Sequence, residues 1–277
     1  MSERTVQGLA AIAAMFARAR NEQRAAFLPF FTVGFPTYET SLDVLTALAE
    51  LDVDGFEIGI PFSDPLADGA VIQEATQVAL NNGTTVKKCL QAVRELRARG
   101  VRQPILLFSY LNPILAYGLE RMVEDAHAAG ADGFIIPDLP PEEGSALDAA
   151  CARAQMALVY FVAPTSSPER IALASQHATG FIYVVSITGV TGARTELPPD
   201  LLAFIQRVRS GTSKPLVLGF GISTPEHARQ MNGLVDGFIV ASALIRLGKE
   251  GVEPVRALAA SLRAALASQE KNEQGGG

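Results

Sequence analysis

Short apolar runs alternate with helix-like segments along the chain, and this alternation restricts the fold more than any other feature of the sequence. The runs are almost continuously apolar, which is typical of parallel strands covered on both faces. Eight such strands, each followed by a helix, predict an α/β protein with a (β/α)8 TIM barrel. The expected strands are Phe27–Val33, Asp54–Ile58, Pro104–Phe108, Gly133–Ile136, Ala157–Phe161, Phe181–Val185, Pro215–Leu218 and Gly237–Val240.

The helix-like segments carry apolar residues at the three- and four-residue spacing of an amphipathic helix. One of them, Thr5–Arg20, precedes the first strand, so we expect an extra N-terminal helix. The other helices are expected at 37–51, 70–81, 85–98, 119–129, 142–154, 168–176, 201–209, 225–231, 243–247 and 252–268.

A short repeat supports the barrel. Asp-Gly-Phe opens the second, fourth and eighth strands, at residues 54–56, 132–134 and 236–238, and Gly180-Phe181 opens the sixth. A signature shared by even-numbered strands fits the alternate-strand layers that fill a TIM barrel. A doubly wound open sheet is the alternative, but no Gly-x-Gly-x-x-Gly motif follows the first strand.

Length and composition set further limits. The 277 residues suit one domain, because a TIM barrel takes roughly 250 residues. We expect a single domain over residues 1–268 and a disordered tail over 269–277. The net charge of −6 and the lack of a basic stripe argue against nucleic acid as a partner. No run has the length and apolarity of a signal peptide or a membrane span, and Cys89 and Cys151 are expected to be free thiols, which together predict a cytoplasmic protein.

Residues Glu57–Gly69 read E-I-G-I-P-F-S-D-P-L-A-D-G, which is typical of a strand that ends in a functional loop. Side chains alternate along a strand, so Glu57 shares its face with Gly55 and Gly59, and we expect these glycines to clear space around it. Inside a barrel, desolvation would raise the pKa of Glu57 to suit proton transfer. Taken alone, a glutamate at a strand end is more often solvated.

Asp68 lies in the loop after this strand. The loops that follow the strands carry the active site of a TIM barrel, so Glu57 and Asp68 would share one mouth. We expect Asp68 to stay ionised in a looser loop and to stabilise positive charge. The other interpretation is that Asp68 caps the next helix by binding its backbone N–H groups.

The last strand ends have the features of a phosphate site. Gly219-Phe220-Gly221 ends the seventh strand, and Ala241-Ser242 leads from the eighth strand directly into a helix. Helix N-termini bind anions through backbone N–H groups, and this part of a TIM barrel often holds phosphate. The loop Thr188–Gly192 is placed to add N–H groups or to close as a lid.

Aromatic residues gather at the same strand ends, where they either pack the barrel or hold a flat apolar group. They are Phe30, Phe108, Tyr110, Tyr183 and Phe220.

The sequence lacks the residues that two kinds of aldolase need. No lysine is expected at an inner strand end, where an amine-based aldolase would need one. His127, His177 and His227 fall on or beside helices, where we expect them to face solvent, so no metal cluster is predicted. Cofactor-free acid–base catalysis on an aromatic phosphate ester remains.

From Phe27 to Leu247 the chain resembles the tryptophan synthase alpha chain family. The most specific match is residues 56–69, F-E-I-G-I-P-F-S-D-P-L-A-D-G. Further matches are Pro29-Phe30, Asn112-Pro113, Pro137–Pro140, Gly189–Gly192 and Gly219–Ser223. The resemblance implies a lyase of tryptophan biosynthesis that cleaves indole-3-glycerol phosphate to indole and glyceraldehyde 3-phosphate without a metal or cofactor.

The same resemblance assigns roles to individual residues. Glu57 matches the glutamate that serves the indole C3 atom and the glycerol hydroxyl, and Asp68 matches the aspartate that holds the indole N–H. Ala241 stands where the family commonly has glycine, and its Cβ would displace the phosphate slightly. The substrate-binding positions implied are Phe30, Tyr110, Ile135, Tyr183, Thr191, Gly192, Phe220, Gly221, Ala241 and Ser242.

The family works as an alpha2beta2 heterotetramer in which indole passes to a beta chain that carries pyridoxal phosphate and makes L-tryptophan. The resemblance therefore implies that this chain itself binds no pyridoxal phosphate. Residues near the beta chain would be Asp64, Pro65, Asn112 and Pro140.

Three other functions stay open. One is a stand-alone lyase that releases free indole, which the same residues would serve. A non-catalytic regulatory subunit is disfavoured by the presence of both Glu57 and Asp68. A phosphosugar isomerase barrel is disfavoured by the Glu57–Gly69 signature.

Overall fold

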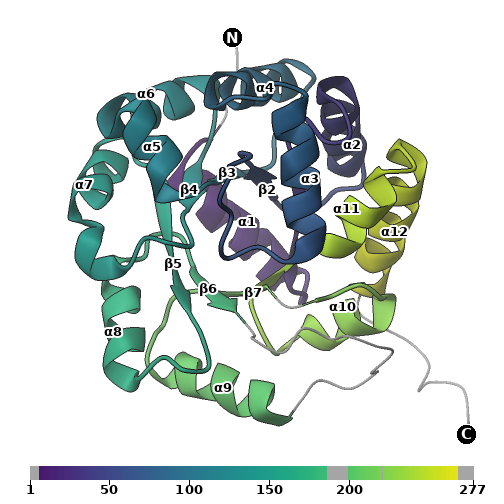
Figure 1. Ribbon diagram of the computed structural model, residues 1–277. Coiled ribbons are helices and arrows are strands. Elements are labelled where there is room, and N and C mark those ends of the chain that lie inside the picture. Colours follow the sequence, from purple (N-terminus) through teal and green to yellow (C-terminus); the bar gives the residue numbers. More distant parts are fainter. Residues whose placement is uncertain (1–5, 186–198, 220, 268–277) are drawn as a thin grey trace, which may run out of the picture.

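The computed structural model describes residues 6–185, 199–219 and 221–267 (Figure 1). Eight parallel strands close into a barrel in the order β1 to β8, which confirms the predicted TIM barrel and excludes the open sheet. The predicted tail at 269–277 lies outside the described residues. The strands are β1 (Ala26–Thr32), β2 (Phe56–Gly59), β3 (Ile105–Phe108), β4 (Gly133–Ile135), β5 (Ala157–Val162), β6 (Ile182–Val185), β7 (Leu216–Gly219) and β8 (Gly237–Val240).

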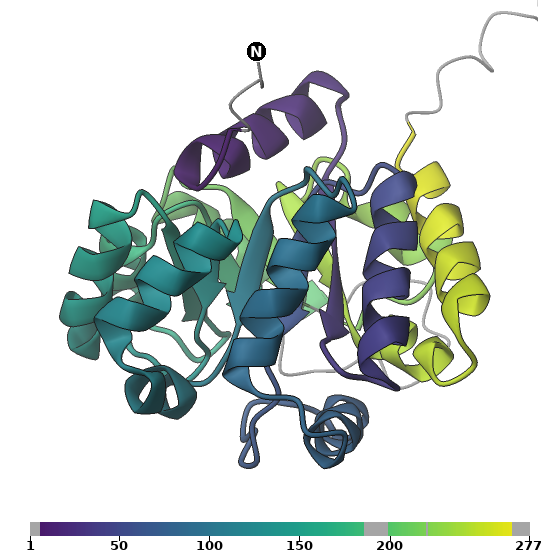
Figure 2. The ribbon, with the colours of Figure 1, turned by 90° about the horizontal axis from the view of Figure 1, so that it is seen from above.

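Helices surround the barrel and cover the outer faces of its strands (Figure 1). Figure 2 shows α1 lying across one end of the barrel, while α3 and the loop before it extend from the opposite end. Among the described residues, no helix is long and apolar enough to cross a membrane. The helices are α1 (Leu9–Asn21), α2 (Tyr38–Glu50), α3 (Ala70–Asn81), α4 (Val86–Ala98), α5 (Leu111–Tyr117), α6 (Leu119–Ala129), α7 (Ser145–Arg153), α8 (Pro168–His177), α9 (Pro199–Ser210), α10 (Pro225–Met231), α11 (Ser242–Gly248) and α12 (Val252–Ala265), with one 3-10 turn, η1 (Pro141–Glu143).

Helix boundaries differ from the prediction where local signals conflict with tertiary contacts. The first helix begins at Leu9 rather than Thr5, because Gly8 has a φ of 66° and its N–H donates to Asp132 Oδ1 at 2.6 Å. Helix α5 was not predicted, because Asn112-Pro113 reads as a turn in the sequence. Proline is nevertheless tolerated in the first turn of a helix, where its missing N–H has no intrahelical partner.

The repeated residues at the start of the even-numbered strands tie each of these strands to the one before it. Each repeat aspartate accepts a backbone N–H from the preceding strand, and Thr179 does the same through its Oγ1 at the sixth strand. These bonds are Phe27 N to Asp54 (2.8 Å), Ile105 N to Asp132 (2.8 Å), Leu158 N to Thr179 (2.8 Å) and Leu216 N to Asp236 (2.9 Å). The repeat is therefore a structural device at the N-terminal end of the barrel.

Asp54 also anchors a buried ion pair. Arg24 donates to both of its carboxylate oxygens at 2.5 and 2.8 Å, and the two side chains are 1% and 0% exposed. Arg18 of α1 adds a third contact at 2.5 Å. Burial opposes the ionisation of Asp54, but the hydrogen bonds from Arg24 and from the Phe27 N–H hold its pKa below the ordinary value.

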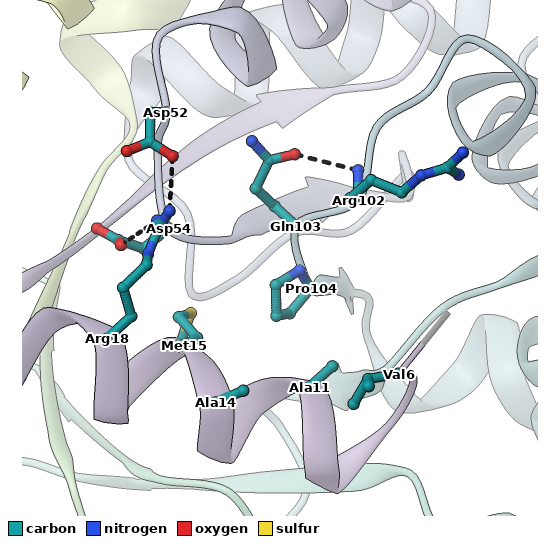
Figure 3. A pocket seen from close by; sticks show the side chains of 10 residues that line it. All are labelled: Val6, Ala11, Ala14, Met15, Arg18, Asp52, Asp54, Arg102, Gln103 and Pro104. Atoms are coloured by element: carbon teal, nitrogen blue, oxygen red, sulfur yellow. Dashed lines mark hydrogen bonds and ion pairs between the residues drawn. The ribbon is translucent and has the colours of Figure 1, made fainter. Parts of the chain in front are cut away.

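A cavity of about 430 Å³ lies between α1 and the starts of β2 and β3 (Figure 3). Its apolar wall includes Ala11 and Met15 of α1. Arg18 at its rim pairs with Asp52 and Asp54. The cavity is thus at the barrel end opposite the loops that follow the strands, where TIM barrels keep their chemistry.

Candidate active site

Glu57 lies inside the barrel, on β2 between Phe30 of β1 and Leu106 of β3. The residue is buried, with 2% of its surface exposed. Burial, together with the nearby charge of Asp68, raises the pKa of Glu57 to about 8, and a 3.5 Å hydrogen bond from the Tyr183 hydroxyl offsets part of this rise. Glu57 is therefore largely protonated at neutral pH, as its predicted desolvation implies.

The glycines beside Glu57 have a different role from the one predicted. A Cβ on Gly55 would lie 2.9 Å from Met15 Sδ, and a Cβ on Gly59 would lie 2.8 Å from Phe30 Cζ. Neighbouring side chains thus fill the space that these glycines leave. The expectation that the glycines clear room around Glu57 is wrong, because α1 and β1 pack into the gaps.

Asp68 is half-buried in the loop between β2 and α3. The alternative that it caps α3 is wrong, since the N-cap of α3 is Gly69 and no side chain caps this helix. Burial raises the pKa of Asp68 to about 6, against a hydrogen bond with the Tyr110 hydroxyl that lowers it. The carboxylate is mainly ionised at neutral pH, but its loop is more closely packed than the sequence indicates.

Aromatic rings form a wall at the C-terminal ends of the strands. Phe108 meets Phe30 edge-on at 5.8 Å between ring centroids and meets Tyr110 edge-on at 6.1 Å. Tyr183 stacks on Phe161 at 4.5 Å. Ile135 is buried and is the β4 partner of Phe108. Of the predicted aromatic positions, Phe220 lies outside the described residues.

Sequence reasoning missed two residues of this region. Phe161 stacks on Tyr183, and Thr32 is buried on β1 with a hydroxyl that has no hydrogen-bond partner among the described residues. Strand alternation could have found Thr32, because it lies two residues after Phe30 and therefore shares its face.

Gly219 is required by a close contact. A Cβ at this position would lie 2.3 Å from Cε1 and 2.6 Å from the hydroxyl oxygen of Tyr183. The first glycine of the predicted phosphate motif therefore makes room for the ring that reaches Glu57. Gly221, the last glycine of the same motif, has a φ of 29°, in the positive range that favours glycine.

The two helices expected at the phosphate site differ at their N-termini. Thr224 caps α10 by accepting the His227 N–H at 3.3 Å. Helix α11 begins at Ser242 after Ala241, and no side chain caps it. The first N–H groups of α11 are thus the ones without a side-chain acceptor. The predicted positions Thr191 and Gly192 lie outside the described residues.

Known proteins resemble this chain along most of its length. The sequence profile of the family described as "Tryptophan synthase alpha chain" matches residues 16–274. The tryptophan synthase alpha chain of Chloroflexus aggregans is 53% identical over 230 residues, which cover 83% of this chain and 86% of that one. That of Roseiflexus castenholzii is 52% identical over 236 residues, covering 85% and 90%. The chain belongs to the tryptophan synthase alpha chain family.

Solved structures agree with this membership. A structure of Mycobacterium tuberculosis tryptophan synthase superposes with a TM-score of 0.87 at 35% identity, covering 93% of this chain and 98% of that one. Tryptophan synthase subunit alpha from Legionella pneumophila gives 0.85 at 34% identity, covering 92% and 98%. Membership in the tryptophan synthase alpha chain family confirms the expected lyase of tryptophan biosynthesis.

The residues that we expected near a beta chain lie after three adjacent strands. Asp64 and Pro65 follow β2, Asn112 follows β3 and Pro140 follows β4. Asp64 and Asn112 are exposed, and the two prolines are half-buried. Two apolar side chains of the same segments are also exposed, Leu66 at 93% in the loop after β2 and Leu115 at 55% in α5.

The histidines only partly match their predicted exposure. His127 is exposed, while His177 is half-buried and places Nδ1 2.8 Å from Asp148 Oδ2. His227 is 7% exposed, so its predicted solvent position is wrong. The reason is that α10 packs against α12. Within the described ranges, no group of three or more His, Cys, Asp or Glu side chains could hold a metal ion.

Proposed function

We propose that Glu57 and Asp68 perform the lyase reaction of this family, the cleavage of indole-3-glycerol phosphate to indole and glyceraldehyde 3-phosphate. The observation that carries the proposal is the buried carboxyl of Glu57, which holds a proton at neutral pH beside an ionised Asp68. A general acid needs a pKa near the working pH, and Glu57 has one.

The reaction takes two proton transfers through one carboxyl group. Glu57 first gives its proton to the indole C3 atom, and Asp68 stabilises the positive charge that spreads to the ring nitrogen. The bond between C3 and the glycerol carbon then breaks, and its electron pair returns to the ring. The glycerol hydroxyl on that carbon passes its proton to Glu57 and becomes the aldehyde. The enzyme is thereby restored without a metal or cofactor.

The two ends of the substrate bind to different parts of the barrel mouth. The aromatic wall of Phe30, Tyr110 and Tyr183, with Ile135, holds the indole ring. The phosphate lies against the uncapped start of α11. The residues assigned to the phosphate are Gly192, Gly221 and Ser242, with Ala241 before Ser242. Thr191 is assigned as a lid residue that helps to order the site, and Phe220 belongs with the aromatic residues that hold the indole ring.

The wider assignment concerns partner, cofactor and compartment. We infer an alpha2beta2 assembly through Asp64, Pro65, Asn112 and Pro140, with pyridoxal phosphate bound only by the beta chain. Both cysteines are buried free thiols, which agrees with a reducing cytoplasm.

The direct test is indole release from indole-3-glycerol phosphate by the purified chain, with and without a tryptophan synthase beta chain. We expect slow release alone and much faster release with the beta chain. Equally fast release in both conditions would favour the stand-alone lyase. No release in either condition would contradict the assignment of Glu57 and Asp68.

A Leu66→Asp variant sharpens this test. Leu66 is 93% exposed, so the substitution leaves the barrel core intact but places a charge in the proposed interface. We expect the activation by the beta chain to fall by about tenfold or more, since a desolvated unpaired charge weakens an interface. Leu202 of α9, which is 39% exposed, offers a matched control in Leu202→Asp.

The two carboxyl groups predict a bell-shaped dependence of kcat/KM on pH. The active form has Asp68 ionised and Glu57 protonated. Asp68 loses its charge as the pH falls through about 6, and Glu57 loses its proton as the pH rises through about 8. We therefore expect a maximum near pH 7. A rate that stays constant from pH 5 to 9 would contradict these roles.

A further inference from the structure

Tyr110 makes three contacts with the loop that carries Asp68. It lies directly after β3 and is buried. Its ring packs on Phe62 with 5.5 Å between centroids. Its hydroxyl oxygen accepts the Ala67 N–H at 2.9 Å. The same hydroxyl also interacts with the Asp68 carboxylate and lowers the pKa of that carboxyl group.

These contacts divide between the ring and the hydroxyl. The ring contributes to the aromatic wall through Phe108, and it would do so equally as phenylalanine. The hydroxyl oxygen, by contrast, accepts the N–H of Ala67, the residue before Asp68. The hydroxyl therefore holds the backbone of the loop next to the carboxylate that the loop presents.

The interaction between the Tyr110 hydroxyl and the Asp68 carboxylate has a definite direction. Burial and the charge of Asp68 raise the pKa of the Tyr110 hydroxyl, so it remains protonated and can only donate to the carboxylate. A donor favours the ionised form of a carboxyl group. This favourable contact opposes the desolvation that would otherwise protonate Asp68.

We propose that Tyr110 is a positioning residue for the lyase reaction, whose hydroxyl holds the loop that carries Asp68 in place through the backbone of Ala67. The inference rests on the proposed function and adds to the role of the ring in binding indole. It predicts that loss of the hydroxyl lowers kcat/KM mainly at low pH and changes KM little.

Tyr110→Phe tests the inference, because it keeps the ring and removes only the hydroxyl. Loss of a hydrogen bond to a charged group is expected to raise the pKa of Asp68 by about one unit. The acid limb of the kcat/KM profile should move up by the same amount, so the variant loses about fivefold at pH 6, approaches a tenfold loss at lower pH and loses almost nothing at pH 8. KM at pH 8 should change little.

Tyr160→Phe is the matched control. Tyr160 is also buried and donates its hydroxyl to an aspartate, Asp148, at 3.0 Å, but that pair lies between β5 and α7. We expect the same acid limb as in the wild-type chain. An equal loss at all pH values in Tyr110→Phe, or an unchanged profile, would overturn the positioning role.

A second measurement separates this inference from the proposed reaction. The pKa of Asp68 can be measured directly by 13C NMR of its carboxyl carbon, without substrate. We expect a higher value in Tyr110→Phe than in the wild-type chain. An unchanged Asp68 pKa would overturn the inference even if the lyase activity is confirmed. An inactive wild-type chain would instead contradict the proposed function.

Discussion

Glu57→Gln should lower kcat for indole release by about 100-fold or more, because general acid–base groups typically contribute at least that factor. Glutamine keeps the size of the side chain but can neither give a proton to the indole C3 atom nor take one from the glycerol hydroxyl. The measurement is steady-state indole release at pH 7, with the substrate in excess over KM. Near-normal turnover would remove Glu57 from the proton transfers.

We also expect the stability of the Glu57→Gln variant to depend on pH differently from that of the wild-type chain. The pKa of Glu57 is about 8 in the folded chain and lies near 4.5 in an unfolded one. The folded state therefore binds the proton more tightly, and its stability from this group is lost as the pH rises from about 4.5 through 8. Glu57→Gln should abolish that part of the pH dependence. Its stability should thus fall less between pH 5 and 8 than that of the wild-type chain, as urea denaturation can measure.

Asp54→Ala should destabilise the chain by about 3–5 kcal/mol, because it removes the buried carboxylate that pairs with the Arg24 guanidinium and leaves only the more exposed Glu22 beside it. The Arg24 side chain is 1% exposed, so water cannot replace the lost partner well. The Phe27 N–H at the start of β1 loses its acceptor as well. Urea denaturation at pH 7 measures the loss.

Asp43→Ala is the control for this prediction. Asp43 of α2 pairs with Arg99 at 2.7 Å, but its side chain is 55% exposed. A surface ion pair contributes about 1 kcal/mol or less, so this variant should be nearly as stable as the wild-type chain. Similar losses in both variants would show that the buried pair at Asp54 has no special weight.

The strands were predictable because their signal is local. A run such as Phe27–Val33 is apolar on both faces, and the only common setting for eight such runs alternating with helices is a closed barrel. The short helix α5 escaped prediction because Asn112-Pro113 favours a turn locally. The start of the first helix was misplaced because the contact that sets it, from Gly8 to Asp132, spans 124 residues.

The candidate site, too, was predictable only where the signal is local in the sequence. Strand alternation was enough to direct Glu57 inward, and the Glu57–Gly69 signature was enough to indicate the family. Alternation alone could not show what fills the space beside Gly55 and Gly59, since Met15 and Phe30 come from other elements. Nor could it show that His227 is buried, because that depends on how α10 packs.

By itself, then, the sequence determined the number and order of the strands, the inward face of β2 and the chemistry available at Glu57 and Asp68. These follow from the spacing of residues along a few turns or strands of chain. Only the tertiary structure decided the pKa of both carboxyl groups and the contact of Tyr110 with Asp68. Both depend on side chains that are distant in sequence, because desolvation and hydrogen bonding act through space and not along the chain.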